Sequence, residues 1–593
     1  MKRSEIDGKY KWNLGDIYES NEVWEADFKK LQEIMPTLGD LKDGLTKSAG
    51  SLADALTRLD EASLLCERLF VYARMNRDED NANSLYQGMT DRAMSLYVAV
   101  SGEASFVAPT LLKEKSSTLE GFLKDEPRLA DYAFMIRNLI RRKKHVLGES
   151  EEKILSMSAD FASGARDIFT MLNNVDMKFG TISKDGEDVQ LTHAKYIELM
   201  QDKDRDVRKD TYDTFYKTFE QNINTIATTY STSVKKDVYY AKVRGYDNAL
   251  GKALFADNVP TALYDKLIDV VHDSLPIMHD YVDVRKKILG LDEIAMYDVY
   301  TPLVEDTDDK YSYEQAIDMC IEALAPMGDE YIALLNRAKD EGWIDVFESE
   351  GKTSGAYSWG PYGTHPYVLL NHREDLNSVY TVAHELGHAL HSYYSEENQP
   401  YPTAGYTIFV AEVASTVNEI LLTMHLLGTT DGNLKKYVLN HYLDQFRTTV
   451  LRQTMFAEFE KIAHAMCESG EPLTQQTLSQ KYGELNKLYY GDVMQTGDTI
   501  SLEWARIPHF YNAFYVYKYA TGFSAAVMIA TGIYQGKEGV LEAYKEFLKS
   551  GGSDYPLGLL KKAGVDFIDG DPVGNCMQVF GEVLGEFKKV MGV

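Results

Sequence analysis

The chain has 593 residues, of which 62 are Lys or Arg and 91 are Asp or Glu, so its formal net charge is −29. Hydrophobic residues make up 44% and charged residues 26%, as in ordinary globular proteins, which excludes a mostly disordered chain. The negative charge argues against a broad surface for nucleic acid or for anionic membranes, whose phosphates it would repel. The length accommodates three or four domains, or one large helical body.

The four cysteines lie far apart and form no CxxC pair, which excludes a disulfide scaffold and a cysteine-built zinc finger. The first residues, MKRSEIDGKYKW, contain no apolar segment typical of a secretory signal. The least charged long stretch, residues 520–534, is too short to span a bilayer. We therefore expect a cytoplasmic protein.

Helical periodicity dominates the chain, which contains only 15 prolines. Apolar residues recur at helical spacing, for example at Leu52, Leu56, Leu59, Leu64 and Leu69. We therefore predict a mainly α protein.

Two regions break this helical pattern. Residues 179–191, FGTISKDGEDVQL, place Asp185-Gly186 between short β-favouring runs, which is typical of a hairpin. Residues 356–370, AYSWGPYGTHPYVLL, are rich in glycine, proline and aromatic residues. They predict a small sheet or extended loops.

Two charged segments allow alternative interpretations. Residues 141–152, RRKKHVLGESEE, form either a linker or a helix end followed by the cap of the next helix, and we favour the second. The acidic run at 305–309 does not match the calcium-binding loop of an EF-hand, because Lys310 occupies a ligand position and the turn glycine is missing. We expect a solvated loop there.

The sequence His384-Glu385-Leu386-Gly387-His388 is an HExxH motif. Cap-type residues at 375–378 and apolar residues that recur from 379 at helical spacing place it on a helix. His384 and His388 then stand one turn apart, where both imidazoles can reach one ion. Glu385, rotated by about 100°, lies beside the metal, where a base for the metal-bound water belongs. Roughly 0.03 chance matches are expected in this length, so surface histidines are a weak alternative.

A catalytic zinc site needs a third protein ligand. The metzincin pattern would place a histidine six residues beyond His388, but that residue is Tyr394. Residues 406–422, YTIFVAEVASTVNEILL, predict a second helix whose polar stripe includes Glu412 and Glu419. Glu412, which is 412 − 388 = 24 residues past the second histidine, is our third ligand. Glu419 is the alternative ligand, or a partner that orients a histidine.

HELGHALHS followed by FVAEVASTVNE resembles the M3 metallopeptidases, which are thimet-oligopeptidase-like enzymes, and most closely bacterial oligoendopeptidase F. WNLGDIYES, LTHAKYIELMQDKDRDVR, AYSWGPYGTHPYVLLN and IPHFYNAFYVYKYATGFSAA match the same subgroup, so the resemblance covers essentially the whole chain. It implies a mainly α, bilobed zincin-type peptidase with a small β-sheet beside the zinc helix and a deep substrate channel. It also implies an N-terminal helical region (1–110), an oligoendopeptidase F-type domain with the hairpin (111–200) and an M3-like catalytic domain (201–593).

The resemblance also implies roles for the motif residues. His384, His388 and Glu412 would bind one zinc ion, and Glu385 would be the general base and proton shuttle. The AYSWGPYGTHPYVLL stretch looks like an edge strand that pairs with the substrate backbone near Gly360, with a purely structural hairpin as the alternative.

In the M3 family a histidine followed by tyrosines contacts substrate and stabilises the tetrahedral intermediate. His509 matches this histidine, and Tyr515 is the best match for the oxyanion tyrosine, with Tyr511 and Tyr517 as alternates. The glycine pair of the thimet branch is absent after His509 and the spacing is shorter. His391 is expected to touch substrate or to orient a ligand.

We therefore expect a zinc endopeptidase that hydrolyses short unstructured peptides. One alternative is a carboxypeptidase-type or dipeptidyl exopeptidase that uses the same site. Another, from a different class, is a zinc-stabilised peptide-binding protein without turnover, against which the retained Glu385 argues. Cobalt or manganese can fit similar ligands.

Overall fold

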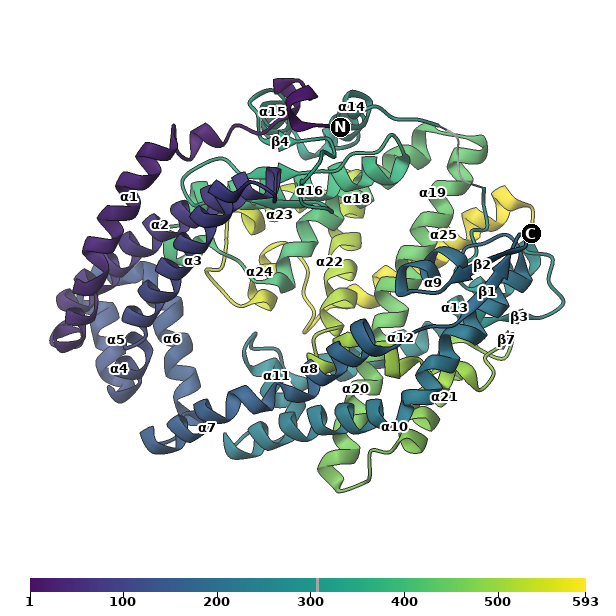
Figure 1. Cartoon of the computed structure of the whole chain (residues 1–593), viewed down its shortest axis with the longest axis horizontal. Coiled ribbons are helices and arrows are strands. Elements are labelled where there is room, and N and C mark those ends of the chain that lie inside the picture. Colours follow the sequence, from purple (N-terminus) through teal and green to yellow (C-terminus); the bar gives the residue numbers. More distant parts are fainter. Residues whose placement is uncertain (306–308) are drawn as a thin grey trace. The chain divides into compact units, whose positions relative to one another are not determined.

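The computed structural model describes residues 1–305 and 309–593, and Figure 1 shows its ribbon. The mainly helical class is confirmed, with only short strands between the helices. The chain forms two compact units: unit 1 contains residues 1–144, 309–425 and 529–565, and unit 2 contains 145–305, 426–528 and 566–593. Each unit joins segments far apart in sequence, so the three-part division at 110 and 200 stays a prediction. Of the predicted loop at 305–309, residues 306–308 lie outside the described part.

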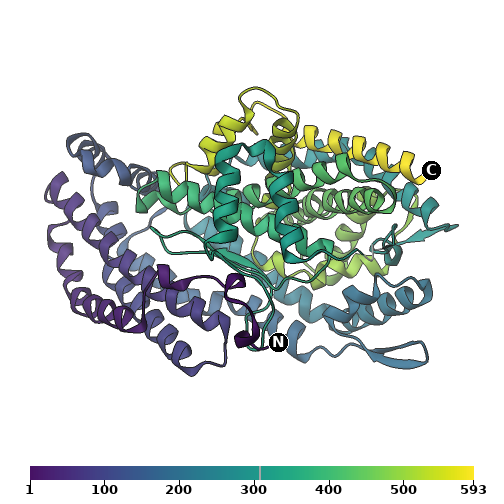
Figure 2. The ribbon, with the colours of Figure 1, turned by 90° about the horizontal axis from the view of Figure 1, so that it is seen from above.

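Unit 1 is built from helices around one small sheet. Its helices are α1 (Asn21–Ile34), α2 (Ala49–Glu79), α3 (Ser84–Ala104), α4 (Val107–Lys113), α5 (Ser116–Asp125), α6 (Ala133–Arg142), α14 (Tyr313–Ala323), α15 (Asp329–Asp340), α16 (Leu376–Asn398), α17 (Tyr401–Ala404), α18 (Ile408–Thr429, up to His425), α23 (Val540–Leu548) and α24 (Pro556–Lys562). In Figure 2 the first of these helices, coloured purple to blue, run beside one another.

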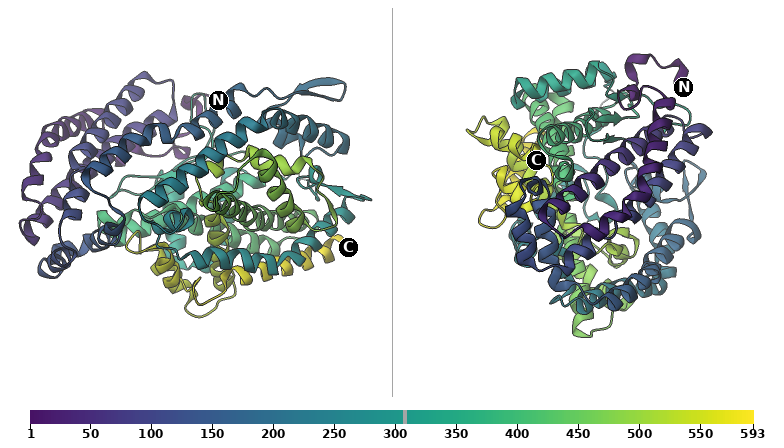
Figure 3. Two further views of the ribbon diagram at one scale, coloured as in Figure 1. Left: turned by 90° about the horizontal axis from the view of Figure 1, so that it is seen from below. Right: turned by 90° about the vertical axis from the view of Figure 1, so that its left-hand side faces the viewer.

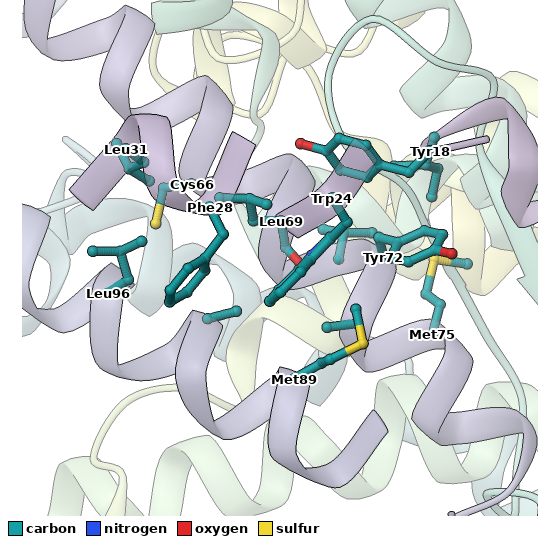
Figure 4. Packing of buried hydrophobic residues seen from close by; sticks show 14 of the residues in the cluster. Tyr18, Trp24, Phe28, Leu31, Cys66, Leu69, Tyr72, Met75, Met89 and Leu96 are labelled. Carbon is teal, nitrogen blue, oxygen red and sulfur yellow. The ribbon is translucent and has the colours of Figure 1, made fainter. Parts of the chain in front are cut away.

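The first core of unit 1 lies between α1, α2 and α3. Trp24 and Phe28 of α1 stack on each other, and the Trp24 indole donates a hydrogen bond of 2.9 Å to the Leu69 carbonyl of α2. Figure 4 shows these rings beside Cys66 and Met89. Burial of such large apolar groups is the main force that holds the helices together.

A three-stranded sheet lies against this core in unit 1. Its strands are β4 (Ile344–Asp345), β5 (Tyr357–Trp359) and β6 (Tyr367–Leu369), in the order β4-β6-β5. β5 and β6 are antiparallel and β4 and β6 are parallel. The sheet predicted at 356–370 is confirmed, and within the described residues β5 is its edge.

Helices α16 and α18 approach each other unusually closely. A side-chain carbon on Gly387 of α16 would lie 2.6 Å from the Ser415 Cα of α18, so only glycine fits between the two backbones. Asn418 of α18 donates a 3.1 Å hydrogen bond to the Ala383 carbonyl of α16. Asp375 caps α16 by accepting from the Ser378 N–H, as the cap residues in the sequence predict.

Unit 2 is also helical. Its helices are α7 (Glu149–Ala162), α8 (Gly164–Met171), α9 (His193–Leu199), α10 (Arg205–Val243), α11 (Ala249–Phe255), α12 (Thr261–Asp273), α13 (Leu275–Ile288), α19 (Gly432–Gln445), α20 (Arg452–Ser469), α21 (Gln475–Tyr490), α22 (Tyr517–Tyr534, up to Met528) and α25 (Pro572–Met591). Its strands are β1 (Thr181–Lys184), β2 (Glu187–Gln190), β3 (Ile294–Ala295) and β7 (Met494–Gln495).

The hairpin predicted at 179–191 is formed by β1 and β2, the ribbon of two strands visible in Figure 3. Asp185 and Gly186 both have positive φ, 54° and 82°, as a two-residue type I′ turn requires. The favoured interpretation of 141–152 also holds, since α6 ends at Arg142 and α7 begins at Glu149. The boundary between the two units falls in the same segment, after Lys144.

Two helical stretches have the length and mean hydropathy of a membrane span, Ser84–Lys113 and Ile408–Thr429. Ile408–Thr429 has 61% of its most apolar window buried inside the protein, so its apolar side chains pack in the core around α16. The first is 17% buried in its window and packs Met89, Ala93 and Leu96 into the core shared with α2. Absence of membrane binding stays a prediction.

Candidate active site

The two histidines of the HExxH motif point at each other from one face of α16. Nε2 of His384 lies 3.1 Å from Nε2 of His388. This follows from their spacing of four residues, which stacks the imidazoles one helical turn apart. Burial, followed by the neighbouring His384, lowers the pKa of His388 to about 3 and keeps this ring a neutral electron-pair donor.

Glu412 of α18 completes a group of three ligand atoms. Its Oε2 lies 3.6 Å from His384 Nε2 and 3.7 Å from His388 Nε2, and Ser415 donates to the same oxygen at 3.3 Å. Around a tetrahedral ion with bonds of about 2.0–2.1 Å, ligand atoms stand roughly 3.3 Å apart. The three side chains therefore fit a single small cation without rearrangement.

Glu419, two turns further along α18, forms a hydrogen bond with the other ring nitrogen of His384. Nδ1 of His384 donates to Glu419 Oε1 and thereby leaves Nε2 directed at His388 and Glu412. Burial lowers the pKa of His384, but the hydrogen bond and charge of Glu419 outweigh it and raise that pKa to about 9. Of the two roles considered for Glu419, the geometry fits the orienting partner and not the ligand.

Glu385 lies beside this group on α16. It is 7% exposed, and its Oε2 is buried without a hydrogen-bond partner among the described residues. Burial, followed by the charges of Glu412 and Glu419, raises its pKa to about 7, against the opposing effect of His384. A buried carboxylate with an uncommitted oxygen can exchange a proton with a ligand in the same cavity.

A cavity of about 1050 Å³ in unit 1 opens onto these residues. One wall consists of His384, Glu385, His388 and Glu412, and another is the edge strand β5 with its flanking residues. Phe70 and Trp359, whose ring centroids are 6.0 Å apart, contribute apolar surface. The cavity can therefore hold an extended chain between a strand edge and a cation group.

Of the predicted substrate-binding residues Gly360 and His391, only Gly360 lines the described cavity. Gly360 lines the cavity, and a side-chain carbon there would lie 3.2 Å from the Pro366 Cα, a close contact between the segments that follow β5 and precede β6. His391 is 1% exposed and stacks on Tyr406 at a centroid distance of 3.7 Å. Tyr406 lines the cavity and His391 is not among the lining residues, so a role for His391 in substrate binding stays a prediction.

The predicted histidine and tyrosines near 509–517 belong to unit 2. His509 is exposed on the short 3₁₀ turn Pro508–Tyr511, and Tyr515 is half-buried with its ring 5.4 Å from that of Tyr519. Tyr511 is buried, stacks on Phe169 and shares a 2.8 Å hydrogen bond with Thr229. Tyr517 is fully buried. The roles of all four stay predictions, and burial favours Tyr515 among the tyrosines.

Among the cavity residues that sequence reasoning missed are Glu67, Glu396 and Tyr406. Burial, followed by the charge of Glu67, raises the pKa of Glu396 to about 8. Glu67 lies on α2, more than three hundred positions before the motif, and no local pattern marks it. Glu396 is two turns beyond His388 on the same helix, so its spacing was a usable signal.

Comparisons with known proteins place this chain among peptidases. The family model "Peptidase family M3" matches residues 198–579, and "Oligopeptidase F" matches residues 111–179. Oligopeptidase PepF of Bacillus subtilis is 42% identical over 99% of this chain and 88% of its own length, and group B oligopeptidase PepB of Streptococcus agalactiae is 40% identical over 99% and 98%. The crystal structure of oligoendopeptidase-F from Enterococcus faecium has a TM-score of 0.74 at 35% identity and covers 96% of this chain and 99% of its own.

Proposed function

This chain belongs to peptidase family M3, and we propose that it is a zinc-dependent endopeptidase which hydrolyses short, unstructured peptides in the cytoplasm. The class, a metalloendopeptidase, follows from the family. The identity of the metal, the roles of the side chains and the location are our proposals. One observation carries them: His384, His388 and Glu412 form a cation-sized group on the wall of a cavity large enough for a peptide.

Zinc is the metal that this donor set suits best. Two imidazole nitrogens and one carboxylate oxygen, with a fourth direction open to the cavity, match the ligand types of hydrolytic zinc sites. When bound, the ion would polarise the scissile carbonyl and acidify water. Glu419 would keep His384 oriented toward it, since the imidazole cannot rotate without losing its Nδ1 hydrogen bond.

Glu385 is the proposed proton carrier. Its Oε2 would accept a proton from the attacking water and later deliver it to the amine nitrogen of the leaving peptide. Its burial supports this role, because an oxygen with no protein partner is available to the reacting molecules. His388, on the same helix, faces His384 and so belongs to the proposed metal ligands and not to the proton transfer.

The substrate is proposed to extend along β5. The unpaired edge of this strand offers main-chain donors and acceptors, which hold a peptide largely independently of its sequence. Folded proteins cannot present a free strand in a cavity of this volume. His509 and Tyr515 are proposed to contact substrate and the developing oxyanion, as the exposed histidine and the more accessible tyrosine of their segment.

The free cysteines support the proposed cytoplasmic location. All four are unpaired thiols and three of them are buried, which fits a reducing compartment.

A pair of matched variants tests the mechanism. Glu385→Gln keeps size and zinc ligands but cannot take a proton, so we expect zinc content to stay near one per chain while turnover falls by about 10³-fold or more. The control is Glu397→Gln, which makes the same change at an exposed residue of the same helix and should remain fully active. Cleavage at the wild-type rate by Glu385→Gln would contradict the mechanism.

End-blocked peptides separate the proposed function from its alternatives. An endopeptidase cuts a peptide that is acetylated at one end and amidated at the other, whereas an exopeptidase needs a free terminus. A peptide-binding protein without turnover would bind such a peptide and leave it intact. We expect cleavage at an internal bond.

A further inference from the structure

The position of β5 decides where a bound peptide lies relative to the metal group. Among the strands of the described residues, β5 pairs with β6 alone, through Tyr357↔Leu369, Ser358↔Val368 and Trp359↔Tyr367. Three residue pairs along one side are a short attachment for a strand at the edge of a three-stranded sheet. Contacts outside the sheet must therefore fix β5 at its depth in the cavity.

Asp78, in the last turn of α2, makes such contacts. Its Oδ2 accepts a hydrogen bond of 2.9 Å from the Tyr357 hydroxyl on β5, and its Oδ1 accepts one of 2.8 Å from the Thr353 hydroxyl. Its main-chain carbonyl accepts a third, of 2.9 Å, from the Thr353 N–H. One residue of α2 thus holds both the strand and the loop that leads into it.

The carboxylate of Asp78 is only 2% exposed, so its charge requires compensation. Arg74, one turn earlier on α2, donates from Nε to both of its oxygens at 3.1 and 3.2 Å. Asn81 donates a further 2.8 Å hydrogen bond to the Thr353 hydroxyl, and Asn371, after β6, donates one of 3.0 Å to the Thr353 carbonyl. A buried charge with this many partners specifies one geometry, because any displacement leaves a polar group unpaired.

We propose that Asp78 is a positioning residue for peptide hydrolysis, which sets where β5 lies relative to His384 through its bonds to Tyr357 and Thr353. It does not line the cavity and so does not touch substrate itself. The inference rests on the proposed role of β5 as the substrate strand. Main-chain pairing depends on the distance and angle of each hydrogen bond, so a small shift of the strand would measurably weaken peptide binding.

The effect should appear in substrate binding and not in metal binding. His384, His388 and Glu412 are held by α16 and α18, whose mutual packing does not involve Asp78. A displaced strand would weaken the main-chain pairing of peptide with β5, while the zinc ligands stay in place. Loss of Asp78 would therefore raise KM and leave the metal content unchanged.

The test uses the full-length zinc enzyme with an end-blocked quenched fluorescent peptide of about nine residues. Asp78→Asn leaves one acceptor oxygen for the two hydroxyls of Tyr357 and Thr353, and Tyr357→Phe removes the donor on the strand without altering a charge. We expect KM to rise by about 10-fold in both, kcat to change by less than about 3-fold, and zinc to remain at one per chain. Rescue of KM by Asp78→Glu is expected to be partial.

Asn76→Ala is the matched control. Asn76 of α2 is also buried, and its side chain donates to the Tyr72 carbonyl of the same helix. Its loss should lower Tm without changing KM. The inference is overturned if KM is unchanged in both Asp78→Asn and Tyr357→Phe, or if Asn76→Ala raises KM equally.

The two ways to fail are distinguishable. If wild-type protein does not cleave the peptide in a metal-dependent way, the proposed function is wrong. If the wild type cleaves and the variants retain its KM, only the role of Asp78 is wrong. Should Asp78→Asn not fold, an unchanged KM in Tyr357→Phe would still overturn the inference.

Discussion

The two glutamates Glu419 and Glu385 have different roles in the site. His384 uses one nitrogen for the ligand group and the other for Glu419, so its orientation is set from outside the metal group. Glu385, on the same helix, keeps an oxygen without a protein partner. One acid therefore positions a ligand and another is free to react.

Glu419→Gln tests this division. The amide can still accept from His384 but carries no charge, so the imidazole becomes a weaker and less firmly oriented ligand. We expect zinc affinity to fall by about 10- to 100-fold, and activity to recover when zinc is added in excess. Competition with a chelator of known affinity measures the change. Wild-type affinity in this variant would contradict the role given to Glu419.

Glu396 gives a prediction about pH. Burial and the charge of Glu67 raise its pKa in the folded state to about 8, against about 4.5 unfolded. Between these values the folded protein holds a proton that the unfolded chain has lost, so this stabilising contribution is present below pH 4.5 and disappears as pH rises through 8.

Glu396→Gln cannot lose that proton. Its Tm should equal the wild-type value near pH 5 and exceed it by a few degrees near pH 9. Thermal denaturation at several pH values between 5 and 9 checks this. A difference that is the same at every pH would show that Glu396 does not titrate in this range.

At the scale of elements, the site depends on the contact between α16 and α18. Gly387 lets the two backbones meet, and this contact brings Glu412 to the histidines. The asparagine bond from Asn418 to the Ala383 carbonyl fixes their register. The glycine inside the motif is therefore a packing requirement.

Gly387→Ala should disturb both stability and metal binding. A methyl group placed 2.6 Å from the Ser415 Cα forces the helices apart. We expect a loss of about 1–3 kcal/mol in the free energy of unfolding together with weaker zinc binding. Gly585→Ala is the control, because nothing lies within 4 Å of a side-chain carbon at that helical glycine. Equal effects of the two substitutions would argue against close packing as the cause.

These elements also show how far sequence alone reaches. The helix around His384, its cap at Asp375 and the hairpin turn at Asp185 were all predictable, because each is encoded by residues a few positions apart. The burial of His391 against Tyr406 was not, since it depends on tertiary packing. The bonds from Asp78 to β5 and to the loop before it were equally hidden, because they join residues 279 and 275 positions apart.

For the whole molecule, charge is the feature with a functional consequence. The chain carries −29, and no Lys or Arg is among the described residues that line the cavity. Such a field attracts cations and repels anions over about a Debye length. Peptides with positive charge should therefore reach the site faster than neutral or acidic ones.

Ionic strength tests this attraction. For an end-blocked peptide containing Lys or Arg, kcat/KM should fall several-fold between about 0.01 and 0.5 M salt, because screening shortens the Debye length. A neutral peptide with the same cleaved bond should show little change. Equal salt dependence for the two peptides would mean that long-range charge does not select substrate.

Zinc reconstitution tests the central claim most directly. The protein is stripped with a chelator, freed of it, and titrated with zinc while hydrolysis of an end-blocked quenched peptide is followed. The account predicts that stripped protein is inactive and that activity rises linearly to a plateau at one zinc per chain. His388→Ala should not recover at that stoichiometry. Full hydrolysis by the stripped protein, or by His388→Ala, would contradict the account.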